Sequence, residues 1–231
     1  MSGSPATTAG QRELRHHFAD LQQQANTASL GMWLFLVTEV MFFGGMFCAY
    51  LIYRLMYFKD FAAASQSIDP LWGGINTAVL LVSSWTMAMA VRCAQLGQQK
   101  LMAIFLLFTM FFGTVFLGVK AKEYHDKYVE HHIPGLNFKF DDKLLGQPDY
   151  VVNQNHAQMF FSLYFAMTGM HALHMIIGLG LMAYLIVASG MGKFDKTYYT
   201  PVENIGLYWH FVDVVWIYLF PLIYLISRTK G

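Results

Sequence analysis

The sequence has 231 residues, of which 56% are hydrophobic and 13% are charged, and its formal net charge is +1. A soluble domain usually carries about 25% charged residues to solvate its surface, so this composition is typical of a membrane protein. The near-neutral charge excludes a basic nucleic-acid-binding surface, and the isolated Cys48 and Cys93, which we interpret as buried hydrophobic residues, exclude a disulfide framework.

The chain divides into a polar amino-terminal segment, residues 1–29, and a membrane domain, residues 30–231. The polar segment lacks the apolar core of a signal peptide. Five apolar segments follow, each longer than the roughly 18 residues that a helix needs to cross the hydrocarbon: 30–53, 71–91, 101–119, 157–189 and 204–227. Backbone in lipid must satisfy its own hydrogen bonds and no alternating barrel pattern is present. We therefore predict an all-α polytopic bundle of five transmembrane helices.

The connections between the spans differ in length. Arg92 and Lys100 lie so close between the second and third spans that a tight hairpin is predicted. The fourth segment would be about 50 Å long as one helix, so it must tilt or project beyond the membrane. Residues 120–156 carry mixed charges and a Pro134-Gly135 turn signal, which predicts an ordered extramembrane loop.

Glycines recur along the spans and predict close packing of helices in lipid. They are Gly44, Gly45, Gly73, Gly74, Gly113, Gly118, Gly169, Gly178 and Gly180. Basic residues do not decide the orientation of the bundle. They favour an external amino terminus when the five lysines of residues 120–156 are counted, and the opposite orientation when they are left out.

Two carboxyl groups lie near the middle of a predicted span, Glu39 in the first and Asp213 in the last. An unpaired charge there costs several kcal/mol, about 2.5–3.5 kcal/mol for Asp at a helix centre on insertion scales. Each is therefore expected to be paired or protonated. One interpretation is a proton relay or polar anchor, and the other, which we favour, is a neutral carboxyl hydrogen-bonded to a neighbouring helix. For Glu39 we predict His171 or His174 as the partner.

Three histidines in the last two spans have two interpretations. His171 and His174 share a face of the fourth span, and His210 precedes Asp213 by three residues. Such residues can ligate haem between helices, or they can be hydrogen-bonding partners of the two carboxyls. A dedicated haem site usually has histidine pairs on two facing helices, so the second interpretation is favoured. No spacing indicates copper or zinc ligands.

Four motifs carry a resemblance to a known family. Residues 208–216 read Tyr-Trp-His-Phe-Val-Asp-Val-Val-Trp and follow Glu203, and residues 168–174 read Thr-Gly-Met-His-Ala-Leu-His. The first span contains Thr38-Glu39-Val40 before two phenylalanines, and Glu123-Tyr124 follows the third. Together these motifs closely resemble subunit III of the haem-copper cytochrome c oxidases in its five-helix bacterial form, across all five spans and in the same order. The family-motif residues on the last span are Tyr208, Trp209, Phe211 and Trp216.

The resemblance implies a non-catalytic subunit of a respiratory complex that reduces dioxygen and pumps protons. It implies no catalytic, metal-binding or cofactor-binding residue in this chain, with haem and copper in the partner subunits. The implied partners are the catalytic subunit I, the copper-binding subunit II, a small subunit IV, membrane lipids including a structural phospholipid, and cytochrome c or another donor through other subunits. The implied roles are to stabilise subunit I, to hold lipids and to sustain proton uptake. The implied location is the bacterial cytoplasmic membrane, with a cytoplasmic amino terminus.

The sequence departs from the mitochondrial form of the family in two places. That form has seven spans, the first two of which have no counterpart here, and it carries Trp and His where this chain has Cys48 and Ile52. Three alternative functions stay open: subunit III of a quinol oxidase, a homologue attached to nitric oxide reductase, and an autonomous proton channel. The channel ranks last because two carboxyls and three histidines are too few for a continuous polar path.

Overall fold

The computed structural model describes residues 18–135, 138–140, 150–194 and 198–225. Six α-helices and one π-helical turn make up this part of the chain, and no strand occurs in the described ranges. In chain order they are α2 (Leu21–Met56), α3 (Phe58–Gln66), α4 (Pro70–Gln95), α5 (Gln99–Val129), α6 (Gln154–Gly190), α7 (Thr200–Phe220) and η1 (Pro221–Leu225).

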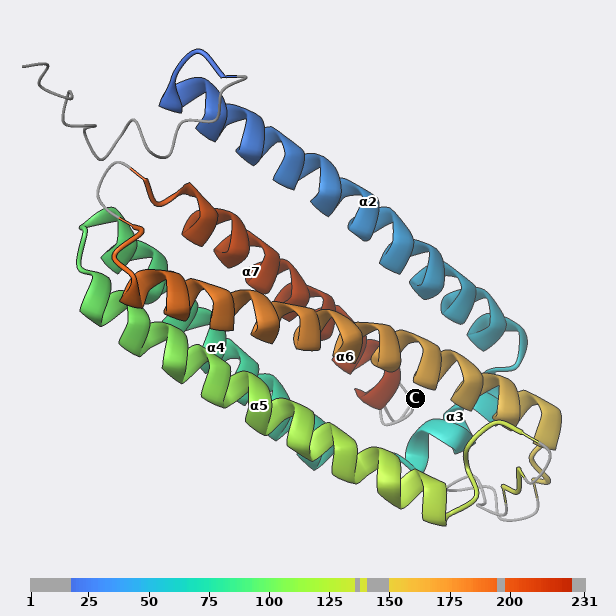
Figure 1. The fold of residues 1–231 in the computed structure, drawn as a ribbon. Helices are drawn as coiled ribbons and strands as arrows, with labels where there is room; N and C mark the ends of the chain where they lie inside the picture. The colour runs from blue at the N-terminus through green and yellow to red at the C-terminus, as the bar shows by residue number, and fades with distance from the viewer. Residues whose placement is uncertain (1–17, 136–137, 141–149, 195–197, 226–231) are drawn as a thin grey trace, which may run out of the picture.

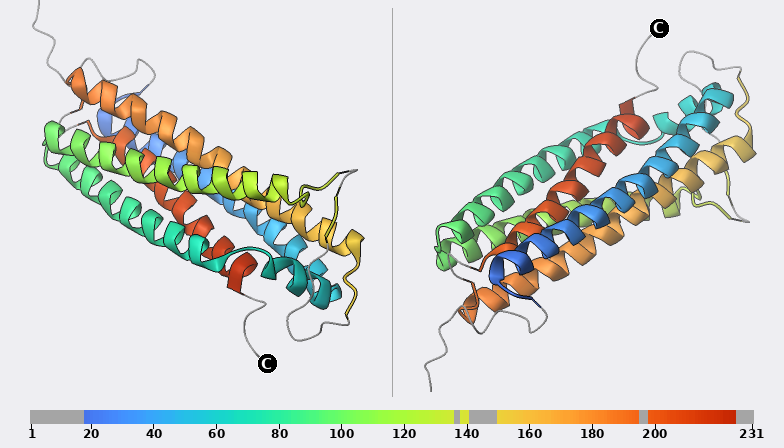
Figure 2. Two further views of the ribbon diagram at one scale, coloured as in Figure 1. Left: turned by 90° about the horizontal axis from the view of Figure 1, so that it is seen from below. Right: turned by 90° about the horizontal axis from the view of Figure 1, so that it is seen from above.

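The five long helices run alternately up and down in one elongated bundle (Figures 1 and 2). Each is long and apolar enough to cross a membrane. The tight turn between α4 and α5 lies at one end, which we call the hairpin end, and α3 lies at the other, the α3 end. The predicted all-α bundle of five transmembrane helices is therefore confirmed.

Helix α7 is the centre of the bundle. It packs against α2, α4 and α6, and α5 lies between α4 and α6. Among the five spans α7 is the most buried within the chain, whereas α2 is the least buried. Apolar side chains of α2 such as Leu30, Met41 and Leu55 are exposed.

Local sequence explains where the helices begin and turn. The Asp69 side chain accepts a hydrogen bond from the Leu71 backbone N–H at 2.9 Å, and Pro70 occupies the first turn of α4. Asn153 caps α6 in the same way through the Asn155 N–H. The hairpin turns at Gly97, whose φ of 73° is readily adopted by glycine. The predicted tight hairpin is present.

The first four membrane-spanning helices extend beyond the predicted spans at both ends, and α7 begins before the fifth span, 204–227, whose last two residues lie outside the described part of the chain. Helix α2 begins within the segment assigned to the polar amino terminus, and α5 continues to Val129 through residues assigned to the 120–156 loop. A short amphipathic helix, α3, was not predicted. Hydropathy marks the thickness of the hydrocarbon, and a helix can continue beyond it into water. Cys48 is exposed and Cys93 buried, so the interpretation of Cys48 as a buried residue was wrong.

The prediction that glycines allow close packing of helices is confirmed at Gly113 and Gly178. A Cβ atom at Gly178 would lie 2.8 Å from two ring atoms of Trp209, and one at Gly113 would lie 2.9 Å from the same indole. The Trp209 ring thus occupies space left by missing side chains on both α5 and α6. Gly180, by contrast, has nothing within 4 Å of its Cβ position.

Gly178→Ala is expected to destabilise the bundle by about 1–3 kcal/mol, because the new methyl group forces a large, buried ring to move. The matched control is Gly180→Ala on the same helix, which should be neutral or slightly stabilising since alanine is the better helix former. Thermal unfolding of both variants in the same detergent measures the difference. Equal midpoints would show that the Trp209 ring adjusts without cost.

Candidate functional site

Glu39 joins α2 to the centre of the bundle through His174. Its Oε2 atom lies 3.1 Å from His174 Nε2, which confirms one of the two predicted partners. The backbone carbonyl of His174 accepts a hydrogen bond from the Tyr208 hydroxyl at 2.9 Å, and the Phe43 ring packs edge-on against the imidazole. Residues from three of the four motifs, those on α2, α6 and α7, therefore meet in this cluster.

The hydrogen bonds of His174 fix how its protons are arranged. Its Nδ1 atom lies 2.8 Å from the Met170 carbonyl oxygen, which can only accept, so Nδ1 carries a hydrogen and donates it. The Nε2···Oε2 contact then requires one more proton. Either a protonated Glu39 donates to neutral His174, or protonated His174 donates to the Glu39 carboxylate. In both cases the pair has no net charge; neutral Glu39 itself stays a prediction.

The hydrogen bonds between histidine and carboxyl that the spacing suggested are not formed by His171, His210 or Asp213. His171 Nε2 lies 3.2 Å from the Val212 carbonyl oxygen, and its ring packs between those of Phe116 and Trp216. His210 Nδ1 lies 2.7 Å from the Ser84 hydroxyl rather than beside Asp213. Neither oxygen of the buried Asp213 carboxyl has a histidine partner within the described part of the chain. The hypothesis of a histidine partner for Asp213 was therefore wrong.

The aromatic motif of α7 fastens this helix to α4. The Trp209 Nε1–H donates to the Ser83 hydroxyl at 3.1 Å, and the Trp216 Nε1–H donates to the Thr77 hydroxyl at the same distance. Phe211 instead points toward α2, where its ring packs edge-on against that of Phe43. Sequence reasoning missed the hydroxyl partners Thr77, Ser83 and Ser84, whose only signal was their position in an otherwise apolar span.

Both carboxylate oxygens of Glu123 have partners in the bundle. Its Oε2 atom accepts from the buried Lys120 ammonium at 3.0 Å. Its Oε1 atom accepts from the hydroxyls of Tyr164 at 2.6 Å and Tyr224 at 2.5 Å. The ammonium also donates to Tyr224 and lies 4.7 Å from the centre of the Trp216 ring. The cluster connects α5, α6 and η1 near the α3 end.

Glu203 lies at the opposite, hairpin end of the bundle. Its Oε1 atom accepts from the Gln95 side-chain amide at 2.8 Å, and Gln95 in turn accepts from Arg92 at 3.3 Å. The contact connects the start of α7 to the end of α4. Glu203 is therefore remote from the Glu39 and Glu123 clusters.

A second carboxylate cluster at the α3 end was not predicted. The buried Asp60 of α3 accepts from the Tyr150 hydroxyl at 2.9 Å and the Asn153 N–H at 3.2 Å, and its Oδ2 lies 2.6 Å from His156 Nδ1. Desolvation, followed by the hydrogen bond to Asp60, raises the pKa of Tyr150 above its ordinary value, which further favours the protonated hydroxyl that donates to Asp60. Asp60 thereby ties α3 to the start of α6.

Comparison with known proteins places this arrangement in a family. The family model described as cytochrome c oxidase subunit III matches residues 13–132 and 150–228. The chain belongs to this family. The subunit III chain is 31% identical to cytochrome c oxidase subunit 3 of Thermostichus vulcanus over 86% of its own length and 87% of the relative's. It is 33% identical to the Synechocystis protein of the same name, over 95% and 82% of the two chains.

The chain is also similar to a relative whose name gives a different electron donor. The cytochrome bo(3) ubiquinol oxidase subunit 3 of Pseudomonas aeruginosa is 26% identical to this subunit III over 95% of the chain and 94% of the relative. The chain is thus a multi-pass membrane protein and a non-catalytic subunit III of haem-copper oxidases. Its motif residues act within the described structure as contacts between helices: Glu39 with His174, Tyr208 with α6, and Trp209 and Trp216 with α4.

Proposed function

We propose that the chain serves a bacterial respiratory cytochrome c oxidase, in the cytoplasmic membrane and with its amino terminus in the cytoplasm. The observation that carries this proposal is the similarity, along most of both chains, to two proteins named cytochrome c oxidase subunit 3. In this complex the chain packs against the catalytic subunit I beside the copper-binding subunit II and a small subunit IV. It stabilises subunit I, retains structural phospholipid and sustains proton uptake, while cytochrome c delivers electrons through other subunits.

We further propose that haem and copper are held by the partner subunits and not by this chain. The engaged ring nitrogens of the membrane histidines support the proposal. Both nitrogens of His174 have partners, and one nitrogen each of His171 and His210 faces an oxygen of a neighbouring helix. Ligation of haem iron or copper at these atoms would require those contacts to break.

A quinol oxidase is the second candidate, and the similarity to the Pseudomonas aeruginosa ubiquinol oxidase subunit favours it. The test is to purify the complex from native membranes through a tag on this chain, identify its subunits and assay oxygen consumption with each donor. A copper-binding subunit and activity with reduced cytochrome c are expected. Activity with quinol alone would establish the second candidate, and a haem absorption band stoichiometric with the separated chain would contradict the proposed absence of haem.

Glu39→Ala is expected to leave the initial rate of oxygen reduction nearly unchanged while weakening the complex. The substitution removes the partner of His174, and an interhelical hydrogen bond in a membrane protein contributes about 0.6–1.7 kcal/mol. Assembly yield or active lifetime should therefore fall about threefold to twentyfold. Oxygen consumption over many turnovers, at matched complex content, measures both quantities.

The matched control is Glu39→Gln, which keeps a hydrogen-bonding group opposite His174 and should lie between alanine and the native residue. An immediate loss of nearly all activity in an assembled, metal-replete Glu39→Ala complex would place Glu39 in the essential proton path instead.

A further inference from the structure

Two phenol hydroxyls converge on one carboxylate oxygen at the α3 end. Tyr164 of α6 and Tyr224 of η1, which we call the phenol pair, donate to Glu123 Oε1 at 2.6 Å and 2.5 Å. Both tyrosines are fully buried, with a relative exposure of 0%. Hydrogen bonds to an ionised acceptor are short and strong. Each phenol therefore has a base in place that can receive its proton.

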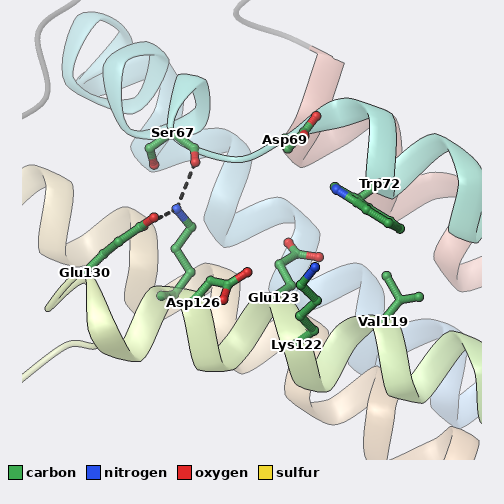
Figure 3. Close-up of a pocket in the computed structure, with 9 residues that line it drawn as sticks. Ser67, Asp69, Trp72, Val119, Lys122, Glu123, Asp126 and Glu130 are labelled. Atoms are coloured by element: carbon green, nitrogen blue, oxygen red, sulfur yellow. Dashed lines mark hydrogen bonds and ion pairs between the residues drawn. The ribbon is translucent and has the colours of Figure 1, made fainter.

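A pocket of about 200 Å³ gives the same carboxylate access to water (Figure 3). It opens between the start of α4, where Asp69 and Trp72 line it, and the last turns of α5, where Asp126 lies beside Glu123. Figure 3 shows the Glu123 carboxylate pointing into the space between these walls. The Glu123 side chain is 15% exposed, whereas that of Lys120 is 5% exposed. Glu123 is therefore the group through which the buried phenol pair can exchange protons with water.

The chemistry of a phenol shows what this arrangement can do. Loss of one electron turns a phenol hydroxyl into a strong acid, and a charged radical among apolar side chains carries a high free-energy cost. A base at hydrogen-bond distance removes this cost, because the proton moves as the electron leaves. Glu123 is such a base for either member of the phenol pair, so these two tyrosines are easier to oxidise than a buried phenol without a base.

The surroundings of the phenol pair favour a long-lived neutral radical. The Phe165 ring packs edge-on against that of Tyr164, with 5.1 Å between the ring centres. The Trp216 ring lies 6.4 Å from that of Tyr224, also edge-on. These contacts keep other reactants away from the ring carbons at which tyrosyl radicals couple. The Lys120 ammonium donates to the Tyr224 oxygen, so this oxygen keeps a hydrogen-bond donor after its own proton has left.

We propose that the phenol pair is a proton-coupled oxidation site for small one-electron oxidants that arrive from water, such as the carbonate radical anion. One phenol gives an electron to the oxidant, which becomes carbonate, while the O–H bond breaks and the proton passes to Glu123. Glu123 then releases this proton to water in the pocket. The cluster returns to its initial charge and holds one neutral tyrosyl radical. The inference concerns this chain alone and does not rest on the proposed electron donor.

The experiment uses the full chain, purified in detergent, and generates carbonate radicals by pulse radiolysis of a bicarbonate solution. Electron paramagnetic resonance of samples frozen after the pulse detects tyrosyl radicals. A long-lived signal is expected in the native chain and in Tyr184→Phe, which changes an exposed tyrosine of α6. The double variant Tyr164→Phe/Tyr224→Phe keeps both rings and should lose most of the signal. A signal that survives in the double variant, or that is lost in Tyr184→Phe, would overturn the proposal.

A second pair of variants tests Glu123 as the base. Both carry Lys120→Met, so that no buried ammonium is left without its counter-charge, and one also carries Glu123→Gln, whose amide accepts hydrogen bonds but no proton. Because a positioned base contributes about 100-fold or more to the rate, Glu123→Gln should slow formation of the tyrosyl radical about 100-fold. The native chain should react more slowly in heavy water than in ordinary water. Equal rates in either comparison would show that the proton does not move with the electron and would contradict the proposal.

Discussion

Glu123→Ala is expected to destabilise the bundle by about 3–5 kcal/mol, because it leaves the buried Lys120 ammonium without its counter-charge. The substitution also removes the acceptor shared by the Tyr164 and Tyr224 hydroxyls. Three elements, α5, α6 and η1, lose a common contact at once. Denaturation of the chain in mixed micelles of mild detergent and dodecyl sulfate, followed by circular dichroism, measures the change in the free energy of unfolding.

A double-mutant cycle with Lys120→Met separates the pair from its surroundings. If the cost of Glu123→Ala arises from an uncompensated charge, the double variant should be more stable than Glu123→Ala alone. Strict additivity of the two changes would show that the 3.0 Å contact between Lys120 and Glu123 contributes no coupling energy.

Asp60→Ala is expected to cost about 2–4 kcal/mol and to loosen the α3 end in particular. The buried carboxylate receives hydrogen bonds from Tyr150 and the Asn153 N–H and contacts His156, so alanine leaves several donors without an acceptor. Hydrogen exchange should quicken in α3 and at the start of α6, while exchange in the α4–α5 hairpin stays unchanged.

Asp126→Ala is the matched control for this substitution, because its carboxylate is on the same end of the bundle and is exposed. It should change stability by about 0.5 kcal/mol or less. Uniform acceleration of exchange along the chain in Asp60→Ala would contradict a local role for the cluster.

Features of the fold and of the site could be predicted from the sequence where burial in the membrane leaves few possible arrangements. Five spans follow from the thickness of the hydrocarbon, and the pairing of Glu39 with a histidine of the fourth span follows from the cost of a solitary carboxylate. The tight hairpin follows from the short distance between two apolar segments. Each of these predictions rests on a free-energy cost large enough to exclude other arrangements.

Other contacts could not be predicted from the sequence, because the side chains involved can take other partners at little cost in free energy. A hydroxyl within a helix can donate to a carbonyl of its own preceding turn, as Thr77 does to Gly73, so the sequence does not show which hydroxyls also reach another helix. His210 and Asp213 lie one turn apart on α7, but their separate orientations depend on what faces each of them. Asp60 lies in a short helix outside the spans, where hydropathy carries no signal.

The Glu39–His174 contact has a consequence for the position of α2 along its own axis. The other groups by which α2 touches α6 and α7 are largely apolar, and the lipid around it is equally apolar, so packing distinguishes poorly between neighbouring registers. A shift by one residue would translate the helix by about 1.5 Å and rotate it by about 100°. Glu39 would then turn away from His174 toward hydrocarbon. A single polar pair of modest strength can therefore select one register for a helix of 36 residues, contributing to the uniqueness of the fold more than to its stability.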